Sequence, residues 1–462
     1  MKLFKRTVAL LTAALLLLSL SGCSFRFSSF DNLLRPPKLS GKYQGLQDSF
    51  ENNVDKGYSL SPPENGSYRS AFIAYDLDND KDEEAIVFYT AKDTPDLVKI
   101  FYFEYNDGTW LPIGSNDGLG SSVDEVKFAD LNYDGKSEII ICWNLFSSKT
   151  NKQFSVYDIS DGSFTLISSF PYTSLKVFDV NGDGIDDIFT MNIDSSVADQ
   201  YSASATTYTY DGKAKKLTAL GSVKTDSNIS SYASIQVESS DDKKLIYVEA
   251  NKGENDMITE IIYWDEENNT LVAPLFDVST QSTQQTLRHG KIMCLDIDDD
   301  KLLEIPVSVD MPGSSFFDKS SAATALNAQN DIQAQKFYYT RWVKLQNNRL
   351  RSVCYSIVDE TSGYILKVPS SWVGRITVLG SDGQWDFYRW SSYEEKVGEL
   401  LFSIYSYDKN DTAAKNKYGS AKLLTSYGST TYVYTVTQEG YKFGVKEQTL
   451  IDNFNASILG GK

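Results

Sequence analysis

Four short acidic segments hold the residues whose types and spacing could do chemistry. In each, oxygen-bearing side chains stand at positions 1, 3 and 5, and an acid follows at position 9. The clearest segment, DVNGDGIDD, begins at Asp179 and ends at Asp187, with Gly184 at position 6. Calcium takes about six to eight oxygen ligands, and a glycine allows the chain to turn sharply between them. The segment therefore predicts a calcium-binding loop.

The other three segments repeat this pattern, with side-chain ligands at positions 1, 3, 5 and 9 and a backbone carbonyl ligand at position 7. We call them loop A (residues 76–84), loop B (130–138), loop C (179–187) and loop D (296–304). The predicted ligands are Asp76, Asp78, Asp80, Asp82 and Glu84 in loop A; Asp130, Asn132, Asp134, Lys136 and Glu138 in loop B; Asp179, Asn181, Asp183, Ile185 and Asp187 in loop C; and Asp296, Asp298, Asp300, Leu302 and Glu304 in loop D.

Position 6 differs among the loops. It is glycine in loops B and C, but Lys81 in loop A and Lys301 in loop D. A left-handed backbone costs a non-glycine residue about 1 kcal/mol, so we expect loops A and D to bind more weakly. We expect up to four structural Ca²⁺ ions, with dissociation constants on the order of 10⁻⁴ to 10⁻³ M.

The elements around the loops form a repeat. Each loop lies between two apolar, β-like runs and is followed by a predicted hairpin, and the first acids of successive loops are 54, 49 and 117 residues apart. The long gap holds a degenerate copy with Glu238, Ser240 and Asp242 and no terminal acid. Five such units predict an all-β propeller of about five four-stranded blades. A solenoid is the alternative, but no capping unit is evident.

The four loops with their flanking strands resemble FG-GAP or VCBS repeats, the family that includes the N-terminal propeller of integrin α chains. This resemblance covers about 300 residues of the chain. It implies that calcium is held within the blades as a structural ion, that ligands bind on the faces of the ring, and that the loops are not catalytic.

The first residues are typical of an exported protein. Lys2, Lys5 and Arg6 precede an apolar run over residues 8–20, which ends in Leu-Ser-Gly and Cys23. This ending resembles the lipobox of bacterial lipoproteins, which implies that Cys23 carries a diacylglycerol. We therefore expect a lipid-anchored protein on the extracytoplasmic face of the cell membrane, with the membrane itself as one partner.

The predicted organisation has five parts. Residues 1–22 are the lipoprotein signal peptide, 23–41 a lipidated tether, and 42–66 a short helix with a lead-in, in which Leu46 and Phe50 lie on one face. Residues 67–362 form the propeller. Residues 363–462 form a small α+β domain with a final helix from Val445 to Leu459.

The composition argues against several classes of function. The net charge of −18 excludes a nucleic-acid partner, since such binding needs a basic surface. His289 is the only histidine, so neither a histidine-rich zinc site nor a catalytic triad with its own motif is evident. Cys142, Cys294 and Cys354 lie in apolar runs and predict buried thiols rather than disulfides.

We therefore expect no enzyme but a binding, adhesion or envelope-interaction module whose ligand is an extracellular protein or glycan. Two alternatives stay open. One is a polysaccharide-degrading lyase or hydrolase built on the propeller, and the other is an accessory protein of envelope assembly or sensing.

Overall fold

The computed structural model describes residues 41–145, 152–160, 163–194, 202–240, 243–314, 337–381, 383–457 and 459. The predicted signal peptide and Cys23 lie outside the described residues, as does nearly all of the predicted tether. Six antiparallel sheets and four helices make up the described chain. No helix in these ranges is long and apolar enough to span a bilayer.

The first three sheets follow one another in sequence order. The first contains β1 (Ser59–Leu60), β2 (Phe72–Tyr75), β3 (Glu84–Ala91), β4 (Thr94–Asn106) and β5 (Thr109–Asp117); the second contains β6 (Ser122–Ala129), β7 (Glu138–Asn144), β8 (Lys152–Ser160) and β9 (Ser163–Tyr172); the third contains β10 (Ser174–Phe178), β11 (Asp187–Asp194), β12 (Ser202–Asp211) and β13 (Lys216–Thr225).

The last three sheets continue this order. The fourth contains β14 (Ser231–Ser240), β15 (Lys243–Lys252), β16 (Asp256–Asp265), β17 (Thr270–Val272) and β18 (Arg288–His289); the fifth contains β19 (Ile305–Asp310), β20 (Tyr338–Gln346), β21 (Arg349–Asp359), β22 (Tyr364–Val368) and β28 (Phe454–Asn455); the sixth contains β23 (Ile376–Ser381), β24 (Gln384–Ser391), β25 (Lys396–Asp408), β26 (Lys422–Tyr427) and β27 (Thr430–Val436).

The predicted repeat units correspond to the first five sheets. In the first three, a strand leads into loop A, B or C, and three antiparallel strands follow. In the fifth, the strand before loop D is reduced to a single bridge between Leu295 and Glu304. The chain is thus mostly β, as expected, with a propeller-like succession of sheets.

Neighbouring sheets pack face to face, which explains why their inner strands are apolar on both sides. In β7, Ile139 and Ile141 face a core shared with β3 of the first sheet, whereas Ile140 and Cys142 face a core shared with the third sheet. Alternate residues of a strand point to opposite faces, so a strand between two cores becomes a continuous apolar run. Its β-branched isoleucines also favour the extended backbone.

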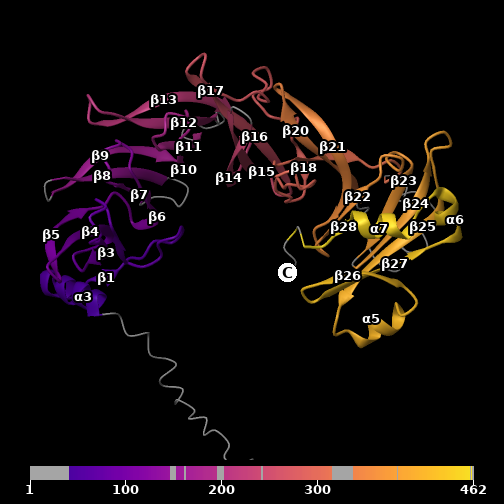
Figure 1. Ribbon diagram of the computed structural model, residues 1–462, viewed down its shortest axis with the longest axis horizontal. Coiled ribbons are helices and arrows are strands. Elements are labelled where there is room, and N and C mark those ends of the chain that lie inside the picture. Colours follow the sequence, from indigo (N-terminus) through magenta and orange to yellow (C-terminus); the bar gives the residue numbers. More distant parts are fainter. Residues whose placement is uncertain are drawn as a thin grey trace, which may run out of the picture.

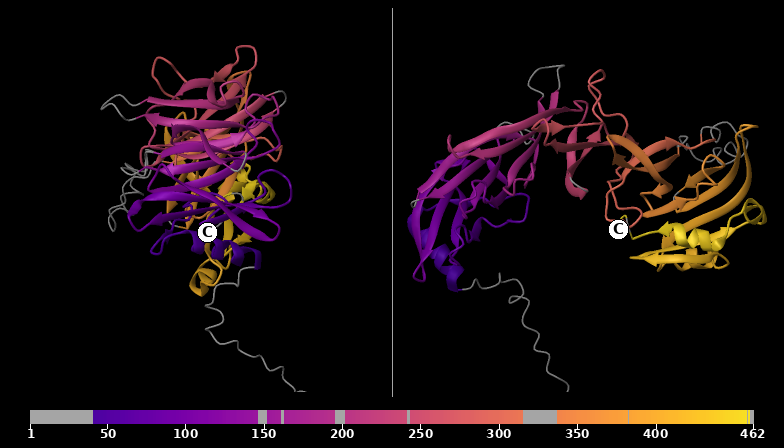
Figure 2. Two further views of the ribbon diagram at one scale, coloured as in Figure 1. Left: turned by 90° about the vertical axis from the view of Figure 1, so that its left-hand side faces the viewer. Right: turned by 45° about the horizontal axis from the view of Figure 1, so that its top comes forward.

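The sheets lie along an open arc, not the closed ring expected from the repeats (Figure 1). The first and last sheets stand at opposite ends of this arc, and Figure 2 shows the same opening from another side. The helix α3 (Gly41–Asn53) covers the outer face of the first sheet, where Leu46 and Phe50 pack on Val87 and Phe103. In a ring, this face would meet the last blade. The predicted helix is therefore present and caps the arc.

The C-terminal part differs from the prediction in two ways. The boundary at residue 363 falls inside a sheet, because β22 pairs with β21. The fifth and sixth sheets also share one hydrophobic core, which includes Ile357, Leu366, Val378 and Phe402. The segment after residue 362 is therefore packed onto the repeats and is not a separate unit.

The predicted final helix is also corrected. The short helix α7 (Glu447–Asn453) occupies only the first part of the predicted range, and β28 follows it. A further short helix, α6 (Gln438–Phe443), lies before that range and ends at Gly444, which is left-handed with φ 103°. The helix α5 (Thr412–Lys417) lies between β25 and β26, and Asp411 caps its N-terminus.

Candidate metal centres

Loops A to D fold alike although their sequences differ. In each, the carboxylate at position 1 accepts the N–H of position 6, and the carboxylate at position 5 accepts the N–H of position 7. The acid at position 9 accepts the N–H of position 2. These last bonds run from Leu77 to Glu84 at 2.8 Å, Leu131 to Glu138 at 2.7 Å, Val180 to Asp187 at 3.1 Å, and Ile297 to Glu304 at 2.7 Å.

The backbone is left-handed at two positions of every loop. Position 6 has φ 80° at Lys81, 86° at Gly135 and Gly184, and 72° at Lys301, as the alternation of ligands led us to expect. Position 4 is also left-handed, with φ 60° at Asn79 and Tyr133, 84° at Gly182 and 63° at Asp299. The sequence analysis missed position 4, although asparagine, glycine and aspartate there are a signal of this conformation.

The acid at position 9 is buried in all four loops. Burial raises the pKa of Glu84 and Glu138 to about 7, and the charges of neighbouring loop acids act in the same direction. Burial also raises the pKa of Asp187, to about 6, partly offset by the Val180 N–H and by the Thr209 hydroxyl. Each of these carboxylates therefore lies where its negative charge is poorly solvated and would be stabilised by a cation.

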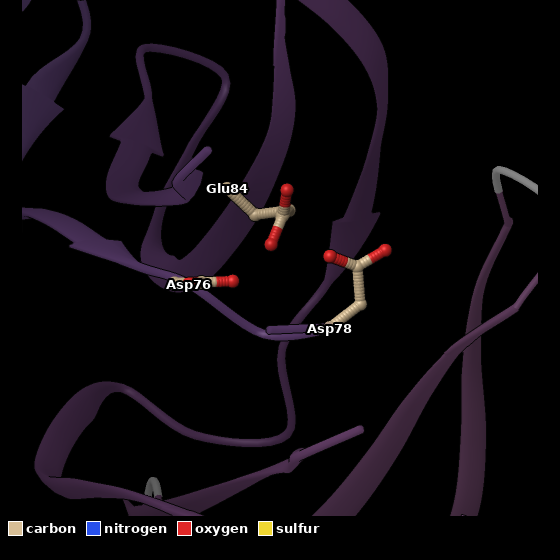
Figure 3. Close-up of side chains that lie close together, drawn as sticks. All are labelled: Asp76, Asp78 and Glu84. Atoms are coloured by element: carbon tan, nitrogen blue, oxygen red, sulfur yellow. The ribbon is translucent and has the colours of Figure 1, made fainter. Parts of the chain in front are cut away.

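Three buried carboxylate oxygens of the loops accept no hydrogen bond from the described residues. They are Oδ1 of Asp76 in loop A, Oδ1 of Asp187 in loop C and Oε1 of Glu304 in loop D, and of these only Glu304 Oε1 has an ammonium group nearby in the described part of the chain, Lys344 Nζ at 2.6 Å. In loop A, carboxylate oxygens of Asp76, Asp78 and Glu84 lie within 4.8 Å of one another. Figure 3 shows these three side chains converging. An oxygen-only donor set with unpaired buried oxygens fits a hard cation such as Ca²⁺.

The third strand of each unit places one more side chain beside position 9, which the sequence analysis missed. Extending the strand pairing by one residue sets Glu84 opposite Glu104, Glu138 opposite Asp158, and Asp187 opposite Thr209. Side chains at such paired positions point to the same face of a sheet and are neighbours. These residues can be identified only from the strand register, which the sequence alone does not give.

Loop A opens onto a small cavity that contains one of these residues. The cavity has a volume of about 230 Å³, and Asp78, Glu84, Glu104 and Lys136 are among the residues that line it. Lys136 Nζ lies 3.6 Å from Asp78 Oδ2, and its side chain is half exposed. Loop A therefore has three carboxylates and one peripheral lysine around a solvent-accessible space.

Loop D differs because a lysine from the third strand reaches its acids. Lys344 Nζ lies 3.5 Å from Asp298 Oδ1 and 2.6 Å from Glu304 Oε1, and it contacts Asp300 more closely still. Burial alone would lower the pKa of Lys344, but the hydrogen bond to Asp300 and the charges of Asp298 and Asp300 raise it above the usual value. Lys344 is therefore charged at neutral pH.

The degenerate fourth copy does not form a loop of this kind. Glu238 and Ser240 lie within β14, and Ser240 pairs with Lys243 of β15. Asp242 lies outside the described residues. Glu238 instead accepts the backbone N–H of Leu303, the residue before Glu304 of loop D, at 2.8 Å.

His289, the only histidine, lies in the short strand β18. Its Nδ1 atom is 2.6 Å from Asp256 Oδ1, and its ring contacts Tyr338 with the ring planes tilted by 35° and 4.3 Å between centroids. Cys142 and Cys294 are buried, as expected, and Cys354 is partly buried.

Comparison with known proteins identifies no family for this chain. No family model matches it, and no curated protein sequence matches it. Among solved structures it is similar to Saccharomyces cerevisiae Sqt1, with 11% identity, 83% of this chain and 98% of that chain covered, and a TM-score of 0.30. A protein from Lactobacillus plantarum has 8% identity, 74% and 94% coverage and a TM-score of 0.28. Bacillus licheniformis rhamnogalacturonan lyase PL11 has 13% identity, 74% and 71% coverage and a TM-score of 0.28. Likeness at this level assigns neither a fold family nor an activity.

Proposed function

We propose that this chain is a calcium-stabilised β scaffold that binds a partner at the extracytoplasmic face of the cell membrane. The observation that carries the proposal is the common geometry of the loops, each of which buries an acid at position 9. In loops A to C, no lysine or arginine contact is recorded for that acid among the described residues. A divalent cation supplies the charge that these loops lack.

Ions in these positions would also stiffen the contact between neighbouring sheets. Loop A and loop B touch each other, since Ser137 N–H donates to Leu77 O at 2.7 Å and the Asn79 side chain donates to Gly135 O at 2.8 Å. Lys244 of the fourth sheet donates to Asp179 O of loop C at 2.6 Å. Calcium would therefore strengthen both the loop and its contact with the neighbouring sheet.

The proposed role is binding and not catalysis. The acids that stand out in the sequence accept hydrogen bonds within their own loops, so they serve the fold, and the partner would contact other surfaces. The partner is an extracellular protein or glycan, reached from a lipid anchor on Cys23. Cleavage of a polysaccharide by the purified protein would contradict this role and favour the alternative of a polysaccharide-degrading enzyme.

Thermal unfolding with and without calcium tests the proposal. We expect saturating calcium to raise the melting temperature of the wild-type protein by several degrees relative to EGTA, because an ion that binds only the folded state stabilises it by mass action, by about 2.7 kcal/mol at 100 times Kd. The triple variant Asp76→Asn, Asp130→Asn, Asp179→Asn should lose this response.

The matched control carries the same change of charge outside the loops. Glu254→Gln, Glu267→Gln and Glu395→Gln alter three exposed turn residues and should leave the calcium response intact. Equal melting temperatures of the wild-type protein in calcium and in EGTA would refute the proposal.

A further inference from the structure

The ammonium group of Lys344 lies among the acidic side chains of loop D. Its Nζ atom lies within 3.5 Å of the acids at positions 3, 5 and 9, and the side chain is only 11 % exposed. The acid at position 9, Glu304, is fully buried and has Lys344 as its charge partner at 2.6 Å. The ammonium group thus contacts three of the five ligand positions that a metal ion would use.

The lysine reaches this place because of the strand register. Ile305 pairs with Val343, so the next pair along the ladder is Glu304 with Lys344. The equivalent residues of loops A, B and C are Glu104, Asp158 and Thr209, all of which present oxygen atoms. One position in the third strand therefore distinguishes loop D from the other three.

The other lysines near the loops do not do the same. Lys244 Nζ lies 2.8 Å from Asp179 Oδ2 at position 1 of loop C, and Lys136 contacts only position 3 of loop A. Among the described residues, Lys244 has a recorded ion pair with position 1 of loop C but none with the position-9 carboxylate of Asp187, whereas Lys344 pairs with Glu304. Neither lysine is as deeply buried as Lys344.

We infer that Lys344 is the resident cation of loop D, and that the residue facing position 9 from the third strand decides whether a loop takes calcium or an internal ammonium group. An oxygen-bearing residue there adds a ligand, or a negative charge, for a metal ion. A lysine there brings its own charge and repels a second cation from the same ligands. The selection of three loops for calcium rests on the calcium proposal above, whereas the role of Lys344 as a charge partner does not.

Calcium stoichiometry of exchanged variants tests this inference. Bound calcium per protein would be measured by equilibrium dialysis at saturating calcium, followed by elemental analysis. We expect three ions for the wild-type protein and three for Lys344→Arg, which keeps the charge. Lys344→Glu, which copies loop A, should bind four, and Glu104→Lys, which copies loop D, should bind two.

Two further variants show whether a changed ion count reflects misfolding and whether the additional ion is bound in loop D. Lys344→Gln removes the positive charge without adding a fifth acid, and it should also bind four ions. Adding Asp298→Asn and Asp300→Asn to Lys344→Gln should return the count to three, which would place the additional ion in loop D. Four ions in the wild-type protein, or three in both Lys344→Glu and Lys344→Gln, would overturn the inference.

Failure of the calcium proposal would look different. If no variant binds calcium, that proposal fails. Thermal unfolding in EGTA then tests separately whether Lys344 is the charge partner of the loop D acids. A melting temperature several degrees lower for Lys344→Gln than for Lys344→Arg would support the internal ion pair, and equal values would overturn it.

Discussion

Three buried carboxylates outside the loops have a basic partner within the protein, whereas buried Glu260 accepts hydrogen bonds from Asp226 N–H and the Thr283 hydroxyl and has a pKa raised to about 7 by burial. Outside the loops, Asp124 pairs with Lys152 at 2.8 Å, Asp226 pairs with Lys252 at 2.5 Å, and Glu249 pairs with Arg288. These are complete ion pairs within the protein, as burial of charge requires. Glu84 and Glu138 have instead a backbone N–H and acidic neighbours. This contrast is the residue-scale argument for an external cation at the loops.

Asp124 allows the internal pairs to be tested by pH. Burial alone would raise its pKa, but hydrogen bonds from Lys152, Tyr172 and Asn65 outweigh this and hold the pKa below the usual value. A lowered folded-state pKa stabilises the protein above the unfolded-state pKa of about 3.9, and this stabilisation is lost as the pH falls through the folded-state pKa.

We therefore expect Asp124→Asn to cost about 2 kcal/mol in the free energy of unfolding at pH 7, and much less near pH 3. Urea unfolding at both pH values measures this difference. Asp117→Asn, which breaks the exposed pair with Lys99, should cost under about 0.5 kcal/mol at either pH. A loss for Asp124→Asn that does not change with pH would show that its charge is not what stabilises the fold.

At the scale of elements, the sequence predicted the loops better than their surroundings. The alternation of oxygen ligands and the glycines at position 6 predicted the left-handed backbone at that position. Few backbone conformations direct alternate side chains toward a single metal ion. The left-handed backbone at position 4 was not predicted, and in loop B the residue there, Tyr133, gives no sign of it. Third-strand residues such as Glu104 were not predicted either, since their place depends on pairing between strands.

The left-handed backbone at position 6 gives a prediction about stability. Lys81 has φ 80°, so Lys81→Gly should stabilise the protein by about 1 kcal/mol in EGTA, whereas Lys81→Ala should be nearly neutral. Gly135 has φ 86°, and a Cβ atom there would meet nothing within 4 Å. Gly135→Ala should therefore cost about 1 kcal/mol for conformational reasons alone.

Urea unfolding in EGTA measures these effects without any contribution from bound calcium. A stabilising or neutral Gly135→Ala would contradict the conformational argument.

The final helix shows why element boundaries were harder to foresee. Apolar spacing suggested one helix from Val445 to Leu459, but Gly444 ends a preceding helix and the chain then forms α7 and β28. The edge strand β26 was not predicted either, since all its residues are exposed or partly exposed and it has no buried apolar face.

At the scale of the whole molecule, repeat spacing predicted the succession of sheets but not its closure. A closed ring and an open arc use the same local contacts between neighbouring sheets, so periodicity cannot tell them apart. At one end of the arc, α3 lies on the first sheet, where its Leu46 and Phe50 cover the face that a last blade would occupy in a ring (Figure 1). The apolar spacing of the helix was visible in the sequence, but its role as a cap was not.

The proposed anchor gives a prediction for the intact protein. Cys23→Ser should move the protein from the detergent phase to the aqueous phase in a Triton X-114 partition of producing cells, because the diacylglycerol can no longer be attached. Cys354→Ser, which changes a thiol inside the folded part, should leave the protein in the detergent phase. An unchanged partition of Cys23→Ser would exclude the lipid anchor.

Anomalous diffraction from crystals grown with a calcium or terbium salt tests the central claim most directly. The account predicts one strong peak in each of loops A, B and C, among the oxygens of positions 1, 3, 5 and 9, and none in loop D, where the Lys344 ammonium should lie. Loops A, B and C without any peak at saturating metal would contradict the claim that these loops are cation sites.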